Sequence, residues 1–123
     1  MKMEFLESGA ADCPLIRISG NDVDPCLRLK VAFGQLHSGT AHEIVLSDLP
    51  GIDPVSGCRL TAKAGKWDRG VLVVDENAFE WVLTPSTWDN VAGLIEPFCS
   101  HAGGYQWLDR TCVAVLISAT GWW

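Results

Sequence analysis

The segment from Cys112 to Ile117 constrains the fold of this chain more than any other feature, because all of its residues are apolar. Successive side chains of a strand point to opposite faces of a sheet, so this segment is apolar on both faces. A strand of that kind lies inside its sheet and is covered by helix. We therefore predict that Thr111–Ser118 is a buried strand, paired with Tyr105–Leu108 around the turn at residues 109–110.

Other segments have the composition and the turn boundaries of short strands. They are Leu15–Ile18, Glu43–Leu49, Cys58–Ala64, Gly70–Val74 and Ala78–Thr84. The last three are separated only by the short turn sequences at residues 65–69 and 75–77. Because short connections indicate antiparallel neighbours, these three segments are predicted to form a meander.

The segment over residues 25–38 fits two secondary structures. Apolar and polar residues alternate over residues 27–33, which is typical of a strand. The segment also carries the apolar stripe of a helix, formed by Leu29, Ala32, Phe33 and Leu36. Asp24 and Pro25 are suited to begin a helix, and Gly39 is suited to end it. Because the start and stop signals agree, we predict a helix over 25–38, with a strand as the alternative.

A second helix is predicted after the strand that ends at Thr84. Ser86 and Asp89 have the spacing of a capping box, which begins a helix. The apolar stripe that follows consists of Trp88, Val91, Ala92 and Ile95. Pro97 clashes with a continuing helix, so the regular part should end near Glu96.

These segments together predict an α+β protein with a mostly antiparallel sheet of about five to seven strands. One or two helices are expected to pack on one face of that sheet. The chain of 123 residues fits one domain spanning 1–123. A chain of this length can bury a substantial core without disulfides or metals.

The chain is acidic, with nine basic and fifteen acidic residues and a net charge of −6. An acidic surface repels phosphate backbones, so no nucleic-acid partner is expected. It favours a basic protein partner, although acidic surfaces also serve solubility alone. No apolar run approaches the length of a membrane-spanning helix, so no membrane association is expected.

The cysteines indicate a reducing compartment. They are Cys13, Cys26, Cys58, Cys99 and Cys112. Their number is odd and no CxxC motif occurs, so neither a zinc ribbon nor a thioredoxin-type site is predicted. The first residues include acids and lack the apolar stretch of a signal peptide. We therefore expect a cytoplasmic protein with reduced thiols.

Motifs for nucleotide binding and hydrolysis are absent, since the sequence contains no GxGxxG, GxxxxGK[ST] or GxSxG. His37 and His42 flank a predicted helix end and are interpreted as solvated, so no metal or cofactor is predicted. Cys99 and His101, with Asp109 beyond them, form the one grouping that resembles a nucleophile and its base. A small enzyme that uses Cys99 and His101 is therefore the least favoured alternative.

All the tryptophans lie in the second half of the chain. Trp81 and Trp88 fall on the apolar faces of predicted elements and are assigned to the core. Trp67 instead sits among charged residues in a turn, a setting in which tryptophan often anchors a partner. Trp122 and Trp123 would point to opposite faces of a strand. At least one of them is expected to pack across an interface, most simply in a two-fold homodimer. The alternative is a chain end that curls back, so that both rings cover the edge of their own domain.

Two charged features lie in the predicted hairpin region. Asp75 and Glu76 are adjacent acids at a hairpin tip, where solvation alone can explain them. Glu80 is expected to form a solvent-side ion pair with the neighbouring strand, Cys58–Ala64. The candidate partner-binding residues are Trp67, Asp75, Glu76, Trp122 and Trp123.

The favoured hypothesis is a non-catalytic, cytoplasmic interaction module. Its concrete form is an inhibitor or immunity-type protein that masks a basic partner with acidic side chains and tryptophan anchors. The alternative is a small-ligand-binding domain with a Trp-lined pocket between sheet and helix. A flat acidic patch around an exposed tryptophan would favour the first hypothesis, and a concave Trp-lined cavity the second.

Overall fold

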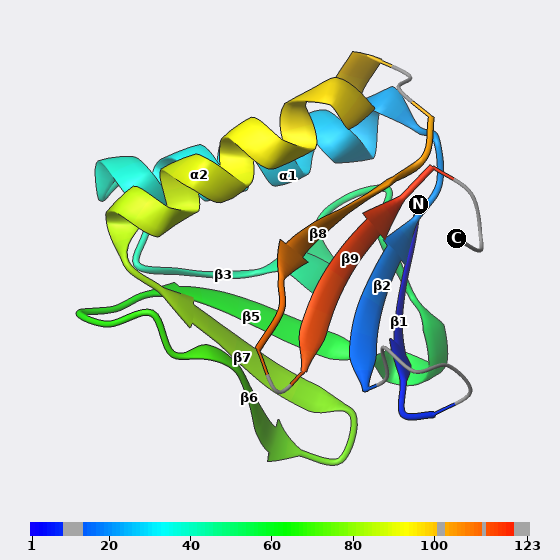
Figure 1. Ribbon diagram of the computed structural model, residues 1–123, viewed down its shortest axis with the longest axis horizontal. Coiled ribbons are helices and arrows are strands. Elements are labelled where there is room, and N and C mark those ends of the chain that lie inside the picture. The colour runs from blue at the N-terminus through cyan, green and yellow to red at the C-terminus, as the bar shows by residue number, and fades with distance from the viewer. Residues whose placement is uncertain (9–13, 101–102, 112, 120–123) are drawn as a thin grey trace.

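The computed structural model describes residues 1–8, 14–100, 103–111 and 113–119. In this part of the chain two helices and nine strands form an α+β fold, which confirms the predicted class. The strands form two sheets, and the two helices lie side by side at one end of them (Figure 1).

The first sheet has five strands in the order β4-β1-β2-β9-β8. In that order their bounds are Asp53–Pro54, Lys2–Leu6, Leu15–Ser19, Ala114–Ser118 and Tyr105–Asp109. β9 lies inside the sheet, as its composition predicts. Its Val115 and Ile117 belong to the main core. The opposite face forms a small separate cluster, made of Leu15, Ala114 and Leu116. Leu6 and Trp107, which come from this sheet, pack against that cluster, so the cover found here is not the predicted helix.

The second sheet has four strands in the order β3-β5-β7-β6. In that order their bounds are Glu43–Val45, Arg59–Ala64, Ala78–Leu83 and Gly70–Asp75. The predicted meander is wrong, because β7 lies between β5 and β6 and runs parallel to β5. The five-residue connection after β5 can span the roughly 10 Å to the strand position beyond β7. β5 and β7 are the two interior strands, and in β7 the alternate residues Phe79, Trp81 and Leu83 are all buried.

Both sheets are mixed, so the prediction of a mostly antiparallel sheet is also wrong. The pairs β1–β4, β2–β9 and β5–β7 are parallel. The first two join strands that are distant in the sequence, so no turn sequence indicates them. The strand count exceeds the prediction because β1 and β4 were not foreseen. β1 lacks a long apolar run, although its Met3 is fully buried, and β4 is only two residues long.

Helix α1 spans Val23–Ser38 and confirms the helical interpretation of this segment. It begins slightly earlier than predicted, with Asp22 in the N-cap position. The Asp22 carboxylate does not cap the helix but accepts a hydrogen bond of 2.8 Å from the N-terminal amine of Met1. Gly39 ends the helix in the left-handed conformation, with φ of 84°, as predicted.

Helix α2 spans Pro85–Ile95, and a 3₁₀ turn, Glu96–Ser100, follows it. The predicted capping box at Ser86 and Asp89 is wrong. The N-cap is Thr84, whose side-chain oxygen accepts a hydrogen bond from the Thr87 N–H at 3.4 Å. Pro85 occupies the start of the helix, where its missing N–H has no cost. The other 3₁₀ turns of the described residues are Leu46–Asp48, which shortens the predicted strand over 43–49, and Val55–Gly57.

Three aromatic side chains form the centre of the core. Phe33 of α1 stacks on Trp88 of α2 at 5.4 Å between ring centroids, with 13° between the planes. Trp81 of β7 meets Trp88 edge to face at 4.9 Å. Trp88 is fully buried, and its Nε1–H donates a hydrogen bond to the Lys63 carbonyl oxygen at 3.0 Å. The same core continues between the two sheets, so it joins both sheets to both helices. The placement of Trp81 and Trp88 in the core is confirmed.

Candidate partner-binding surface

The connection between β5 and β6 presents Trp67 to solvent, and this residue is 74% exposed. Its neighbour Asp68 is held firmly. Asp68 Oδ1 accepts hydrogen bonds from the Thr84 N–H at 2.8 Å and from the Thr84 hydroxyl at 3.1 Å. Asp68 Oδ2 accepts one from the Thr87 hydroxyl at 2.8 Å. The connection is therefore tied to the first turn of α2, and Trp67 projects from an anchored position.

The ionised form of the Asp68 carboxylate is the form that accepts the hydrogen bonds from Thr84 and Thr87. The hydrogen bonds, led by that from the Thr84 backbone, lower the pKa of Asp68 below its ordinary value. A lowered pKa means that the contact stabilises the fold above the ordinary pKa of 3.8, and that this contribution is lost as the pH falls further. At neutral pH the anchor is therefore fully formed.

β6 forms an outer edge of the second sheet, and its second half is apolar and exposed. Val73 is 67% exposed and Val74 is 59% exposed. The register with β7 shifts between Val73 and Asp75, so this end of the strand carries a bulge. Bulges bend a strand and increase its twist, which explains why two valines leave the core. Among the described residues no strand pairs with the outer side of β6, so its main chain offers hydrogen-bonding groups there.

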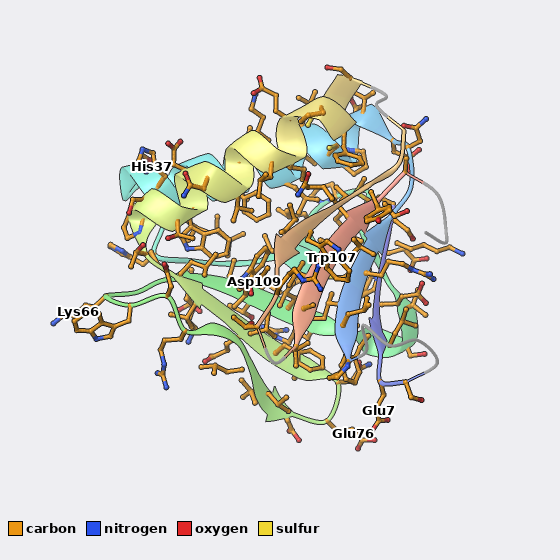
Figure 2. All side chains as sticks on the ribbon, viewed as in Figure 1. Glu7, His37, Lys66, Glu76, Trp107 and Asp109 are labelled. Atoms are coloured by element: carbon orange, nitrogen blue, oxygen red, sulfur yellow. The ribbon has the colours of Figure 1, made fainter. Side chains whose placement is uncertain are left out.

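The end of β6 is acidic. Asp75 and Glu76 are exposed at the turn into β7, where the Glu76 N–H donates to Asp75 Oδ1 at 2.7 Å. The Asn77 side chain donates to the Ser56 carbonyl oxygen at 2.7 Å and so fixes the turn against a neighbouring segment. Glu7 lines the same shallow hollow as Glu76, and the two lie close together in Figure 2. The hairpin tip therefore concentrates negative charge.

The beginning of β6 is basic. Lys66 and Arg69 are exposed on either side of Trp67 and the anchored Asp68. Neither forms an ion pair with any residue that the structure describes. Figure 2 shows Lys66 and Glu76 at opposite ends of the second sheet. We call the surface made by residues 66–69, β6 and Asp75–Glu76 the β6 edge.

The β6 edge thus unites Trp67, Asp75 and Glu76 from the predicted partner-binding residues. The other two, Trp122 and Trp123, lie outside the described residues. Val73 and Val74 were not among the partner-binding residues predicted from the sequence, because the segment Gly70–Val74 was expected to lie inside a meander. Only the position of β6 at the edge of its sheet makes these side chains candidates.

The expected ion pair on the solvent side of the second sheet is confirmed. Glu80 Oε2 lies 2.6 Å from Lys63 Nζ, across the parallel pair β5–β7. Both side chains are about one-third exposed, so the pair adds little to stability. Its hydrogen bond to Glu80 raises the pKa of Lys63.

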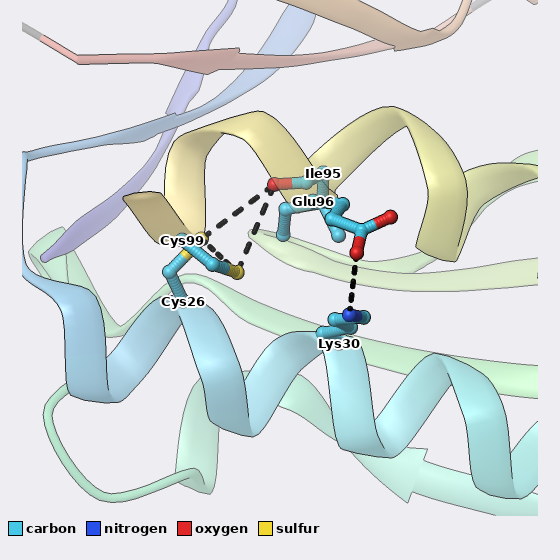
Figure 3. Close-up of polar contacts among 5 residues, drawn as sticks. All are labelled: Cys26, Lys30, Ile95, Glu96 and Cys99. Atoms are coloured by element: carbon cyan, nitrogen blue, oxygen red, sulfur yellow. Dashed lines mark hydrogen bonds and ion pairs between the residues drawn. The ribbon is translucent and has the colours of Figure 1, made fainter. Parts of the chain in front are cut away.

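The predicted nucleophile grouping consists of Cys99, His101 and Asp109, and in the structure Cys99 and Asp109 contact different residues. His101 lies outside the described residues. Cys99, in the turn after α2, has its Sγ 3.0 Å from that of Cys26 on α1 (Figure 3). An ion pair of 3.1 Å between Lys30 and Glu96 joins the same two elements. Asp109 of β8 accepts a hydrogen bond of 2.8 Å from Trp81 Nε1–H. Cys99 therefore contacts helix α1, and Asp109 contacts the core residue Trp81.

Buried thiols make the stability of the protein sensitive to alkaline pH. Burial raises the pKa of Cys26 to about 12, with a further contribution from Cys99. Burial, and then the charge of Glu4, raises the pKa of Cys58 to about 11. An unfolded chain ionises these thiols near their ordinary pKa of 9.0, whereas the folded chain keeps them protonated. Their contribution to stability is therefore complete below pH 9 and is lost as the pH rises through the folded values.

We accordingly expect the free energy of unfolding to fall between pH 9 and about pH 11 in urea titrations. Cys58→Ala should show a smaller alkaline loss than the wild-type chain, because one of the two thiols is removed. Equal losses in the two proteins would show that Cys58 does not contribute to the alkaline transition.

A groove beside α1 is the cavity to compare with the hypothesis of a small-ligand-binding domain. It has a volume of about 500 Å³. Its apolar lining comes from Leu27, Val31, Ile44 and Leu49. Arg28 adds a positive charge to this lining, and Asp24 adds a negative one. Trp81 and Trp88 fill the core instead and do not line this groove.

Within the described ranges, no three His, Cys, Asp or Glu side chains gather as a metal site would require. His37 Nδ1 lies 2.9 Å from the Pro85 carbonyl oxygen, and His42 is exposed. Neither α1 nor α2 is long and apolar enough to cross a membrane.

Comparison of the chain with protein-family models, with curated proteins and with solved structures finds no match.

Proposed function

We propose that this protein is a non-catalytic interaction module that binds an extended segment of a partner protein at the β6 edge. The observation that carries the proposal is the exposure of Val73 and Val74 on a strand whose outer side pairs with no other strand of the described residues. Monomeric proteins usually protect such edges with charges, prolines, bulges or a covering segment. β6 has a bulge and charged residues at its two ends, but Val73 and Val74 remain apolar and exposed between those charges. An edge that combines open main-chain groups with apolar side chains is suited to strand addition by a partner.

The two ends of the β6 edge supply specificity. Trp67 projects beyond the start of the strand from a connection that Asp68 anchors, so the backbone beside this residue is held in place before a partner covers the indole. Large, pre-positioned aromatic side chains contribute much of the binding energy at protein interfaces. Asp75 and Glu76 lie at the other end, where they can attract basic residues of the partner.

Charge extends this argument to the class of partner. The net charge of −6 attracts a basic protein over long range and speeds its association. An inhibitor or immunity-type protein that covers a basic partner in the cytoplasm is therefore the concrete form of the proposal. The groove beside α1 supports a second candidate function, the binding of a small apolar ligand whose polar groups Asp24 and Arg28 could contact.

Two valines of equal exposure allow a matched test. Val74 on the β6 edge and Val31 in the groove are both 59% exposed. Tagged wild-type protein, Val74→Lys and Val31→Lys would be used to isolate partners from the native host. The bound proteins would then be identified, and their affinity for purified variants measured by calorimetry.

The proposal expects a partner that Val31→Lys retains and that Val74→Lys binds at least about tenfold more weakly. Trp67→Ala should weaken the same partner. If Val31→Lys abolishes binding and Val74→Lys does not, the contact surface is the groove, and the β6 edge is not the functional site.

A further inference from the structure

We propose that the β6 edge also binds a second copy of this chain, through antiparallel pairing of the two β6 strands about a two-fold axis. The inference rests on the proposed function only in taking the β6 edge as a contact surface. The new element is the binding partner, a second copy of this chain that covers the β6 edge when no other protein is bound.

The order of charges along β6 points to this occupant. Basic residues Lys66 and Arg69 precede the strand, and acidic residues Asp75 and Glu76 follow its exposed half. In an antiparallel pair the beginning of one strand lies beside the end of the other. A segment that complements this edge must therefore be basic first and acidic last, and β6 itself has that order.

A two-fold axis that pairs Leu72 with Leu72 of the second copy, with the bulged Val73 and Val74 taken together as one position, keeps paired side chains on the same face. It opposes Arg69 of one copy to Glu76 of the other, and symmetry repeats this pair at the opposite end. The exposed Val73 and Val74 of one copy then lie opposite Val71 of the second copy, which is only 4% exposed and therefore contributes main-chain pairing rather than apolar surface. Cross-strand pairs of opposite charge are among those that stabilise antiparallel sheets.

This pairing closes at two copies and stays weak. The interface is isologous, so it uses up the outer side of β6 and leaves no growing edge there. The bulge between Val73 and Asp75 adds twist and limits the length of the pairing. A weak dimer protects the apolar edge and can still be displaced by a tighter partner. Self-association and partner binding should therefore compete.

Charge reversal tests the proposed geometry. Arg69→Glu places like charges opposite Glu76 twice in each dimer, and Glu76→Arg does the same with positive charge. Sedimentation equilibrium over a wide concentration range should show association at least about tenfold weaker for each single variant. The double variant Arg69→Glu/Glu76→Arg should restore the wild-type constant. An equimolar mixture of the two single variants should form heterodimers, because each supplies the charge that the other needs.

Several outcomes would overturn the inference. Unchanged association of both single variants would place self-association on another surface, such as the C-terminal tryptophans. A wild-type chain that stays monomeric at every concentration would exclude the dimer, while partner binding lost in Val74→Lys would leave the proposed function intact. Arg69 and Glu76 are both exposed, so unchanged circular dichroism and melting temperature would show that each variant remains folded.

Discussion

Trp88→Ala is expected to lower the free energy of unfolding by about 3–5 kcal/mol, the usual cost of truncating a large buried aromatic side chain. Trp88 is fully buried, stacks on Phe33 and meets Trp81 edge to face. The substitution also leaves the Lys63 carbonyl oxygen without the hydrogen bond it accepts from the indole. Denaturant titration followed by circular dichroism measures the loss.

Trp67→Ala provides the matched control for this prediction. It removes the same side chain from an exposed position, so it should change stability by less than about 1 kcal/mol. Its effect should appear in partner binding instead. A larger stability loss from Trp67→Ala than from Trp88→Ala would mean that the roles of these two indoles have been exchanged.

The second large effect is expected at Gly70, where β6 begins. Gly70 has φ of 74°, a conformation that costs roughly 1–2 kcal/mol for a residue with a side chain. A methyl group at this position would lie 2.7 Å from Cγ2 and 2.8 Å from Cβ of Thr111. The short Thr111 side chain cannot swing away, so the turn between β8 and β9 must shift. That turn is anchored by Asp109, which accepts hydrogen bonds from the Thr111 N–H and from Trp81.

Gly70→Ala should therefore destabilise the protein by about 2–4 kcal/mol, the conformational cost plus the cost of overpacking. Gly39→Ala isolates the first contribution, because Gly39 has a similar φ of 84° and no atom within 4 Å of the added methyl group. It should cost roughly 1–2 kcal/mol. Equal losses for the two variants in denaturant titrations would show that Thr111 does not resist the methyl group.

Core assignments were the most predictable part of this protein. The stripe through Trp88 and the alternation around Trp81 identify buried faces because a helix and a strand repeat their side chains at different periods. Gly39 marks a helix end for a comparable local reason, since its left-handed conformation suits glycine. These features depend on a few neighbouring residues and do not require knowledge of the whole fold.

The candidate site was only partly predictable. Trp67 and the pair Asp75–Glu76 were identified from charge and turn composition, which are local properties. The fact that these residues lie along one sheet edge was not predicted, because it depends on β6 lying outside β7. The segment Gly70–Val74 has the composition of an ordinary sheet strand, so the exposure of Val73 and Val74 could not be read from it.

The amino-acid sequence by itself determined the α+β class, both helices, most of the strands, the aromatic core and the net charge of −6. Each of these follows from residue periodicity, turn residues or a sum of charges. Only the tertiary structure decided the division into two mixed sheets, the parallel pairs β2–β9 and β5–β7, and the position of β6 at an edge. Strand order depends on how distant segments share one core, and no local pattern records that choice.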